Sequence, residues 1–151
     1  MSKNSPLVTV VIPTYNRHDL LPDTLNDIIK QDYENFEIVI VEQSNTCSSE
    51  TLEIARQHAQ KIKLYHVNFK GLPTARNFGL QMANGEYVIF IDDDIRCGRD
   101  FLSNHMQSFV SSGADIQGGG VEEKFHAQHE VKIDDIGRFN YWTATPMTGF
   151  Q

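Results

Sequence analysis

Short runs of apolar residues alternate along the chain with longer stretches in which apolar residues recur every three or four positions. The short runs are rich in β-branched and aromatic residues and are bounded by polar residues, glycine or proline, as buried β-strands are. The longer stretches have the period of amphipathic helices. The pattern predicts strands over 7–15, 36–43, 63–69 and 87–92, and helices over 18–31, 48–62, 72–83 and 99–112.

Local signals agree with two of these helix ends. Ser48-Ser49-Glu50-Thr51 is a suitable N-terminal cap, and Asn84-Gly85 is a suitable C-terminal cap. A fifth apolar stretch over 114–121 is interrupted by three glycines, and the pattern degrades beyond residue 122.

Strands that alternate with helices at this spacing form βαβ units with right-handed crossovers. The fold class that follows is α/β, with a mostly parallel central sheet flanked by helices. We expect a core over 7–122, followed over 123–151 by the incomplete start of a further region, so that the chain looks like part of a longer protein.

Charge and composition argue against several classes of protein. The 151 residues are 40% hydrophobic and carry 13 Lys+Arg against 20 Asp+Glu, a formal net charge of −7. This balance argues against a nucleic-acid binder, and it means that a phosphate-bearing ligand must be held by local groups. Cys47 and Cys97 are too few for a disulfide framework, which favours a reducing, cytoplasmic setting. There is no signal-peptide pattern, and the longest apolar runs, of about five residues, are too short to span a bilayer.

Polar residues follow each predicted strand, at the edge where open α/β sheets bind ligands. The four groups are Pro13-Thr14-Tyr15-Asn16-Arg17, Glu42-Gln43-Ser44-Asn45, the pair Arg76 and Asn77 on the helix after the third strand, and Asp92-Asp93-Asp94.

The three consecutive aspartates are the sharpest of these features. Their mutual repulsion raises their proton affinity unless a cation neutralises them. A period of two places Asp92 and Asp94 on one side and Asp93 on the other. Mg²⁺ typically takes one or two carboxylates and completes its shell with water and phosphate. The alternative is a solvated acidic turn that flanks the next helix.

The remaining candidates are weaker one by one. Arg76 can stabilise a phosphate, Glu42 can accept hydrogen bonds from a base or ribose, and Tyr15 can pack against a base. Each has an ordinary structural alternative: a surface arginine, a residue that flanks a helix, and a half-buried tyrosine. Together they describe a pocket for a nucleoside diphosphate.

Four segments carry a family resemblance. VTVVIPTYNR (8–17), FEIVIVEQSN (36–45), GLPTARNFGL (71–80) and GEYVIFIDDD (85–94) resemble the N-terminal half of the family-two glycosyltransferases, which have the Rossmann-like GT-A fold. The four motifs have the family's order and spacing, and the resemblance covers roughly residues 7–122.

The resemblance implies a donor site and a metal site. It places the base near Thr14 and Tyr15, puts Glu42 where the family usually has an aspartate, and matches Asp92 and Asp94 to the Asp-x-Asp motif. The residues expected to bind the donor nucleotide are Pro13, Thr14, Tyr15, Arg17, Glu42, Arg76, Asp92 and Asp93, and those expected to hold Mg²⁺ or Mn²⁺ are Asp94 and Asp92.

The implied reaction is the transfer of a sugar from a nucleoside diphosphate donor to an acceptor hydroxyl, with inversion, in polysaccharide biosynthesis. UDP is the default nucleotide, although Glu42-Gln43 departs from the family's usual acidic pair and leaves GDP and dTDP open. The acceptor is a sugar or a lipid-linked sugar. No general base is identified within the chain. A peripheral contact with the inner face of the membrane and the oligomeric state are left open.

Other classes remain as alternatives. A non-catalytic module that binds nucleotide sugars would share these motifs. A sugar nucleotidyltransferase would carry a Gly-rich loop with Arg or Lys after the first strand, where this chain has Pro13-Thr14-Tyr15-Asn16-Arg17. A phosphoacceptor receiver domain would need an acidic pair after the first strand, which is absent there.

Overall fold

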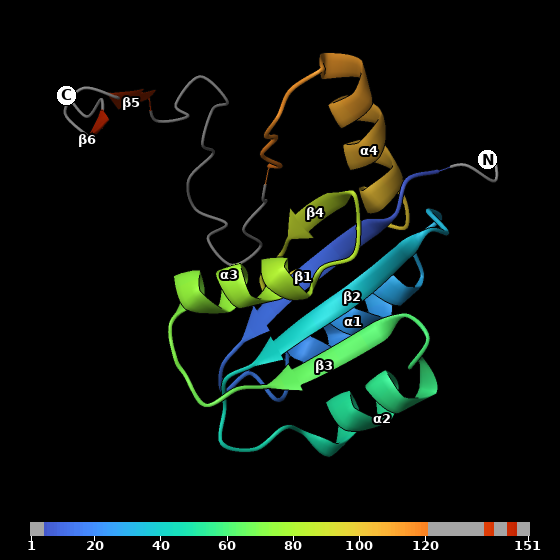
Figure 1. Ribbon diagram of the computed structural model, residues 1–151, viewed down its shortest axis with the longest axis vertical. Coiled ribbons are helices and arrows are strands. Elements are labelled where there is room, and N and C mark those ends of the chain that lie inside the picture. The colour runs from blue at the N-terminus through green and yellow to red at the C-terminus, as the bar shows by residue number, and fades with distance from the viewer. Residues whose placement is uncertain (1–4, 121–137, 141–144, 148–151) are drawn as a thin grey trace, which may run out of the picture. The chain divides into compact units, whose positions relative to one another are not determined.

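The computed structural model describes residues 5–120, 138–140 and 145–147 (Figure 1). The strands are β1 (Val8–Thr14), β2 (Phe36–Glu42), β3 (Ile62–His66), β4 (Tyr87–Phe90), β5 (Arg138–Asn140) and β6 (Thr145–Met147). The helices are α1 (Leu21–Ile29), α2 (Ser49–Gln57), α3 (Leu72–Met82) and α4 (Phe101–Ser112).

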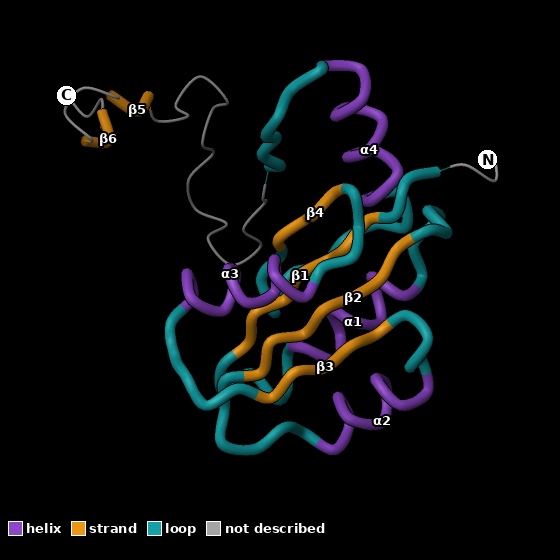
Figure 2. The backbone as a smooth tube through the Cα atoms, in the orientation of Figure 1, coloured by secondary structure: helices purple, strands orange, loops and turns teal. Residues whose placement is uncertain are grey.

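The first four strands form one parallel sheet in the order β3-β2-β1-β4. The chain therefore winds outward from β1 to β3 and then returns past β1 to place β4 on the other side. Since crossovers are right-handed, this reversal puts α1 and α2 on one face of the sheet and α3 on the opposite face. Figures 1 and 2 show α3 in front of the sheet and α1 behind it.

The two faces bury separate apolar clusters because side chains alternate along each strand. On one face, Val8, Val10 and Ile12 of β1 pack with residues of α1 and α4. On the other, Val11 packs with Ala75 of α3. All seven residues of β1 and all seven of β2 are buried, as expected of central strands in a parallel sheet covered on both faces.

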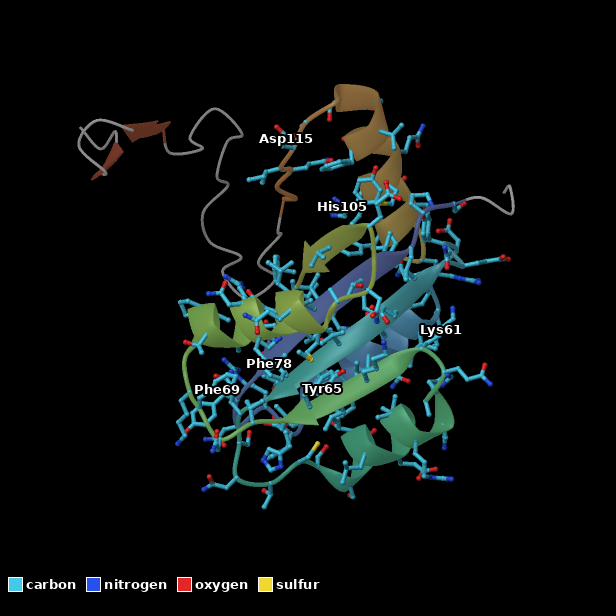
Figure 3. All side chains as sticks on the ribbon, viewed as in Figure 1. Lys61, Tyr65, Phe69, Phe78, His105 and Asp115 are labelled. Atoms are coloured by element: carbon cyan, nitrogen blue, oxygen red, sulfur yellow. The ribbon has the colours of Figure 1, made fainter. Side chains whose placement is uncertain are left out.

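Helix α3 is fixed closely to the sheet. A Cβ atom at Gly79 would overlap the side chain of Val11, so the helix approaches β1 where glycine leaves room. Nearer its N-terminus, the ring of Phe78 makes edge-on contacts with Tyr65 of β3 and with Phe69, each at 5.6 Å between centroids (Figure 3). These contacts hold the loop that leads into α3.

Pro13 lies inside the central strand β1, where a missing N–H would normally leave a gap in the ladder. The carbonyl of Val11 accepts from Ile91 N on the β4 side at 3.1 Å. Pro13 faces the same side two residues later, beyond the end of the pairing between β1 and β4. The strand tolerates proline there because the pairing with β4 has already ended.

A cluster of polar residues lies near the amino-terminal ends of the strands, beyond the end of α3. Glu37 of β2 accepts hydrogen bonds from Thr9, Lys63 and both nitrogen donors of Asn84. Burial alone would raise the pKa of Glu37, but these hydrogen bonds outweigh it and lower the pKa to about 2. This carboxylate is therefore a structural element of the fold.

All four predicted strands and all four predicted helices of the core are present, with some ends displaced. The predicted helix 48–62 was too long: α2 ends at Gln57, and Ile62 starts β3, where it pairs with Ile38 of β2. Ile62 fits the helical period, but burial in the sheet decides its place. The predicted cap at Ser48 is confirmed, since its hydroxyl accepts from Thr51 N at 3.1 Å.

The predicted cap at Asn84-Gly85 is wrong in its mechanism. Helix α3 stops because Ala83 is extended, and neither Asn84 nor Gly85 has the left-handed conformation of a C-cap. Gly85 is instead required by close approach, since a Cβ atom there would lie 2.6 Å from Thr9 N. By contrast, α4 does end in a left-handed glycine, Gly113 at φ 63°.

The chain divides into two compact units, residues 1–117 and 118–151. The first contains the four-stranded sheet, and the second contains the antiparallel pair β5 and β6. The predicted boundary near residue 122 stays a prediction, because most of the region 123–151 lies outside the described residues. In the part of the chain that the structure describes, no helix has the length and apolarity needed to cross a membrane.

Candidate functional site

The carboxyl ends of β1 and β4 lie side by side at the point where the strand order reverses. At such a point the connections leave in opposite directions and a crevice opens beyond the sheet. The predicted residues at 13–17, 42 and 92–94 all follow or end strands at this edge, and α3 with Arg76 follows β3 at the same edge.

Asp93 faces inward. Its side chain is 8% exposed, and Oδ2 accepts a hydrogen bond of 2.6 Å from the Thr14 hydroxyl. Burial raises the pKa of Asp93, partly offset by the Thr14 hydrogen bond, and the neighbouring Asp94 raises it further. From α1, the hydroxyl of Thr24 lies 2.9 Å from the carbonyl oxygen of Asp93 and 3.0 Å from that of Ile95, which fixes the turn.

Asp92 and Asp94 are exposed, and each lies beside an arginine from another element. Arg76 of α3 donates to Asp92 Oδ1 at 3.0 Å, and Arg17 Nη1 lies 4.0 Å from Asp94 Oδ2. Nε of Arg76 is buried and has no hydrogen-bond partner among the described residues. The site therefore presents two pairs of opposite charges, each joining an exposed aspartate to an arginine from another element.

Tyr15, at the end of the β1 segment, is 43% exposed. Lys70, in the loop before α3, donates to its hydroxyl at 2.9 Å, and the ammonium lies 4.8 Å from the ring centroid. The hydrogen bond from Lys70 and its positive charge lower the pKa of Tyr15. An aromatic face and a cation thus lie together at the rim of the site.

Glu42 is buried more deeply than the sequence suggested, at 2% exposure. Its Oε1 accepts from Ser44 N at 2.7 Å, and its charge raises the pKa of the nearby thiol of Cys47, where burial has the larger effect. The Ser44 hydroxyl accepts from Asn16 N at 2.7 Å, and the Ser44 carbonyl accepts from His66. Glu42 thus shapes the loop that borders the site.

Gln43 connects the two sides of this edge. It is 6% exposed, its Nε2 lies 3.3 Å from the carbonyl oxygen of Thr14, and its Oε1 accepts from Gly71 N at 2.8 Å. Its backbone N–H also donates to the Thr14 carbonyl at 3.0 Å. The sequence linked this amide only to the identity of the nucleotide and did not suggest that it bridges two segments.

The donor set fits a hard divalent cation. Asp92 and Asp94 both offer exposed carboxylate oxygens, and such oxygens suit Mg²⁺ or Mn²⁺. No group of three or more His, Cys, Asp and Glu residues gathers among the described residues in a way that could hold a metal. The chain would supply two ligands, and phosphate and water the others.

Comparison with known proteins identifies the family. The model of glycosyl transferase family 2 matches residues 9–146 of this chain. The putative teichuronic acid biosynthesis glycosyltransferase TuaG of Bacillus subtilis is 31% identical over 149 residues, which is 89% of this chain and 58% of that protein. The poly(ribitol-phosphate) beta-N-acetylglucosaminyltransferase TarS of Staphylococcus aureus is 32% identical, over 91% of this chain and 26% of that protein.

Solved structures agree. S. aureus TarS in complex with UDP-GlcNAc has a TM-score of 0.62 and 28% identity over 77% of this chain and 37% of that one. The mannosyltransferase PcManGT of Pyrobaculum calidifontis, in complex with GDP-Man and Mn²⁺, has a TM-score of 0.63 and 29% identity over 71% of this chain and 33% of that one.

These likenesses confirm the GT-A fold. This chain spans only part of the length of these relatives, 58% in TuaG and 26% in TarS. The family match covers most of the chain and includes the four segments on which the resemblance rests, except for the first residue, Val8. The chain belongs to glycosyl transferase family 2.

Proposed function

We propose that this chain binds the donor of a glycosyltransferase that moves a sugar from a nucleoside diphosphate to an acceptor hydroxyl. The observation that carries the proposal is the arrangement at the reversal of strand order: Asp93 is held inward by Thr14, which leaves Asp92 and Asp94 facing outward. The family membership and the relatives' nucleotide-sugar ligands support the same assignment.

Residues of the β1 and β2 segments would hold the nucleoside. Tyr15 offers an exposed ring on which a base can pack, and Pro13 and Thr14 end the buried strand that precedes it. Glu42 contributes through its buried carboxylate, which already fixes the backbone of Ser44. UDP is the nucleotide we propose, since TarS is solved with UDP-GlcNAc and UDP.

Charged residues on the other side would hold the diphosphate. Arg17 and Arg76 are paired with Asp94 and Asp92, and these ion pairs can exchange partners when a phosphate and a metal arrive together. Such exposed pairs are weak, so their rearrangement costs little free energy. We assign the metal to Asp94 and Asp92. Asp93 was expected to bind the nucleotide, but because it is buried against Thr14 we assign it to holding the turn.

A divalent ion bound there would neutralise the diphosphate and stabilise it as a leaving group. The expected outcome is attack by an acceptor hydroxyl on the anomeric carbon with inversion. The relatives' names, which refer to teichuronic acid and poly(ribitol phosphate), support a polysaccharide acceptor. We assign no general base among the residues that the structure describes, and we keep the prediction of a cytoplasmic site of action.

The experiment is a calorimetric titration of the protein with UDP-GlcNAc and UDP-glucose in Mn²⁺. The wild type should bind one of these donors, and Asp94→Asn should weaken that binding by at least tenfold. Asp115→Asn is the matched control, because Asp115 is exposed beyond α4, away from this edge (Figure 3). Equal affinities in wild type and Asp94→Asn contradict the metal assignment. A folded wild-type protein that binds neither donor contradicts the proposed donor site.

A further inference from the structure

We propose that Gln43 is a positioning residue of the nucleotide site: its buried amide sets the separation between the β1 turn that carries Tyr15 and the loop that carries Lys70. The inference rests on the proposed function for its effect on nucleotide binding, but its structural half can be tested without any ligand.

The Gln43 amide can donate a hydrogen bond at one end and accept one at the other, which the ionised side chain of glutamate, of the same shape, cannot do. The Thr14 carbonyl can only accept and the Gly71 N–H can only donate, so the bridging group must donate at one end and accept at the other. A carboxylate would accept from Gly71 but repel the Thr14 oxygen. Gln43 is 6% exposed, so water does not readily replace either contact.

The loop on the far side is shaped for this contact. Gly71 has φ 127°, a conformation that side chains rarely adopt, and its N–H points back to Gln43. Its carbonyl accepts from Ala75 N in the first turn of α3, and Phe69 packs against Phe78. The loop is therefore anchored before and after Lys70, and the anchor toward β1 is Gln43.

A second contact joins the same two segments at the protein surface: the Lys70 ammonium donates to the Tyr15 hydroxyl at 2.9 Å. The cations Arg17 and Arg76 already face Asp94 and Asp92, whereas no ion pair to Lys70 is formed within the described residues. Lys70 therefore keeps its charge available for an anionic donor beside the ring of Tyr15. Shifting either segment would separate the ring from the cation and weaken both contacts with the nucleotide.

The test compares Gln43→Glu with Gln31→Glu. Gln31 is a matched control: it is 9% exposed, donates to the Gly98 carbonyl at 2.7 Å and accepts from Leu102 N at 2.9 Å. Both substitutions replace the NH₂ group that donates to a backbone carbonyl oxygen by a carboxylate oxygen, which that carbonyl oxygen repels. Both should lower the melting temperature. Only Gln43→Glu should weaken the binding of UDP with Mn²⁺, by roughly tenfold.

A ligand-free readout accompanies the titration. With ¹³C-labelled tyrosine, NMR follows the pKa of Tyr15, which Lys70 lowers in the wild type. In Gln43→Glu the pKa of Tyr15 should rise toward its ordinary value, and in Gln31→Glu it should not move. If either glutamate variant does not fold, Gln43→Met and Gln31→Met replace them, since they remove the hydrogen bonds without adding charge.

The outcomes separate the two proposals. A Tyr15 pKa that is the same in wild type and Gln43 variants overturns the inference. So does a loss of UDP affinity that is equal in the Gln43 and Gln31 variants, because Gln43 would then act only on stability. A wild-type protein that binds no nucleotide contradicts the proposed function, and this is seen before any variant is compared.

Discussion

The hydroxyl of Thr14 at the end of β1 donates a hydrogen bond of 2.6 Å to Asp93, 79 residues later in the chain. The bond joins the end of β1 to the turn that follows β4, at the point where the strand order reverses. Of the three consecutive acids in this segment, one is buried and two are exposed. The contact holds Asp93 inward, while Asp92 and Asp94 on either side of it are exposed.

Replacing Asp93 with asparagine should stabilise the fold at neutral pH. Burial is the main cause that raises the pKa of Asp93, so ionising it opposes folding. When the pKa of an acid is higher in the folded state than in the unfolded chain, its protonated form stabilises the fold. This stabilisation is full below the pKa of the unfolded chain and is lost as the pH rises through the pKa of the folded state. Asparagine keeps an acceptor for Thr14 without the charge. The gain, measured by urea unfolding, should be present at pH 7 and shrink toward pH 3.

The matched change is Thr14→Val, which keeps the shape and removes the donor. It should destabilise the fold by about 1–3 kcal/mol, since it leaves a buried carboxyl without its partner. An Asp93→Asn protein that is less stable than wild type at pH 7 would show that the charge itself contributes to the fold.

Glu37→Gln should destabilise the fold at pH 7, by roughly 3 kcal/mol if the whole charge contribution is lost. Burial opposes ionisation of Glu37, yet hydrogen bonds from Lys63, Asn84 and Thr9 lower its pKa from 4.5 to about 2. For an acid with a lowered pKa, the stabilisation is full above the unfolded pKa and is lost as the pH falls through the folded one. The difference between wild type and variant should therefore shrink between pH 4.5 and pH 2.

Glu53 provides the control for this prediction. Hydrogen bonds from Arg56 and Gln57 also lower its pKa to about 2, but the group lies on the surface of α2. Exposed pairs contribute little, so Glu53→Gln should leave the unfolding curve nearly unchanged. A difference between wild type and Glu37→Gln that stays constant from pH 7 to pH 2 would mean that the Glu37 charge is not what stabilises the cluster.

Gly79→Ala should destabilise the packing of α3 on the sheet by about 1–3 kcal/mol, because the added methyl overlaps Val11. Val11→Ala removes the overlapped atoms, so the double variant should be more stable than the sum of the two single changes predicts. Gly118→Ala is the control, since nothing lies within 4 Å of a Cβ atom there. Strict additivity in thermal unfolding would contradict the close approach of the two residues.

The sequence predicted the sheet well because its two central strands are buried throughout. Segments such as Val8–Thr14 and Phe36–Glu42 are apolar almost throughout, and short helical stretches between them leave a parallel sheet as the simple solution. The end of α2 was misplaced because Ile62 satisfies both the helical period and the strand, and only its pairing with Ile38 decides between them.

The sequence indicated which residues gather at this edge of the sheet, but it did not indicate the hydrogen bonds among them. The structure agrees with the alternation expected for the three acids, since Asp93 is buried and Asp92 and Asp94 are exposed. The bond from Thr24 to the Asp93 turn and the bridge from Gln43 to Gly71 join segments far apart in sequence, so no local pattern reports them. The acid Glu37 inside a buried strand did carry a signal, since burial there requires a partner.

The central claim is that the edge beyond β1 and β4 binds a nucleoside diphosphate through a metal at Asp94. It is tested most directly by calorimetric titration of the protein with UDP, GDP and dTDP, in Mn²⁺ and in EDTA, beside Asp94→Ala. The account predicts that UDP binds in Mn²⁺, and that both EDTA and the substitution abolish this binding. A folded protein that binds none of the three nucleotides, or binds UDP equally well in EDTA and in Asp94→Ala, would contradict it.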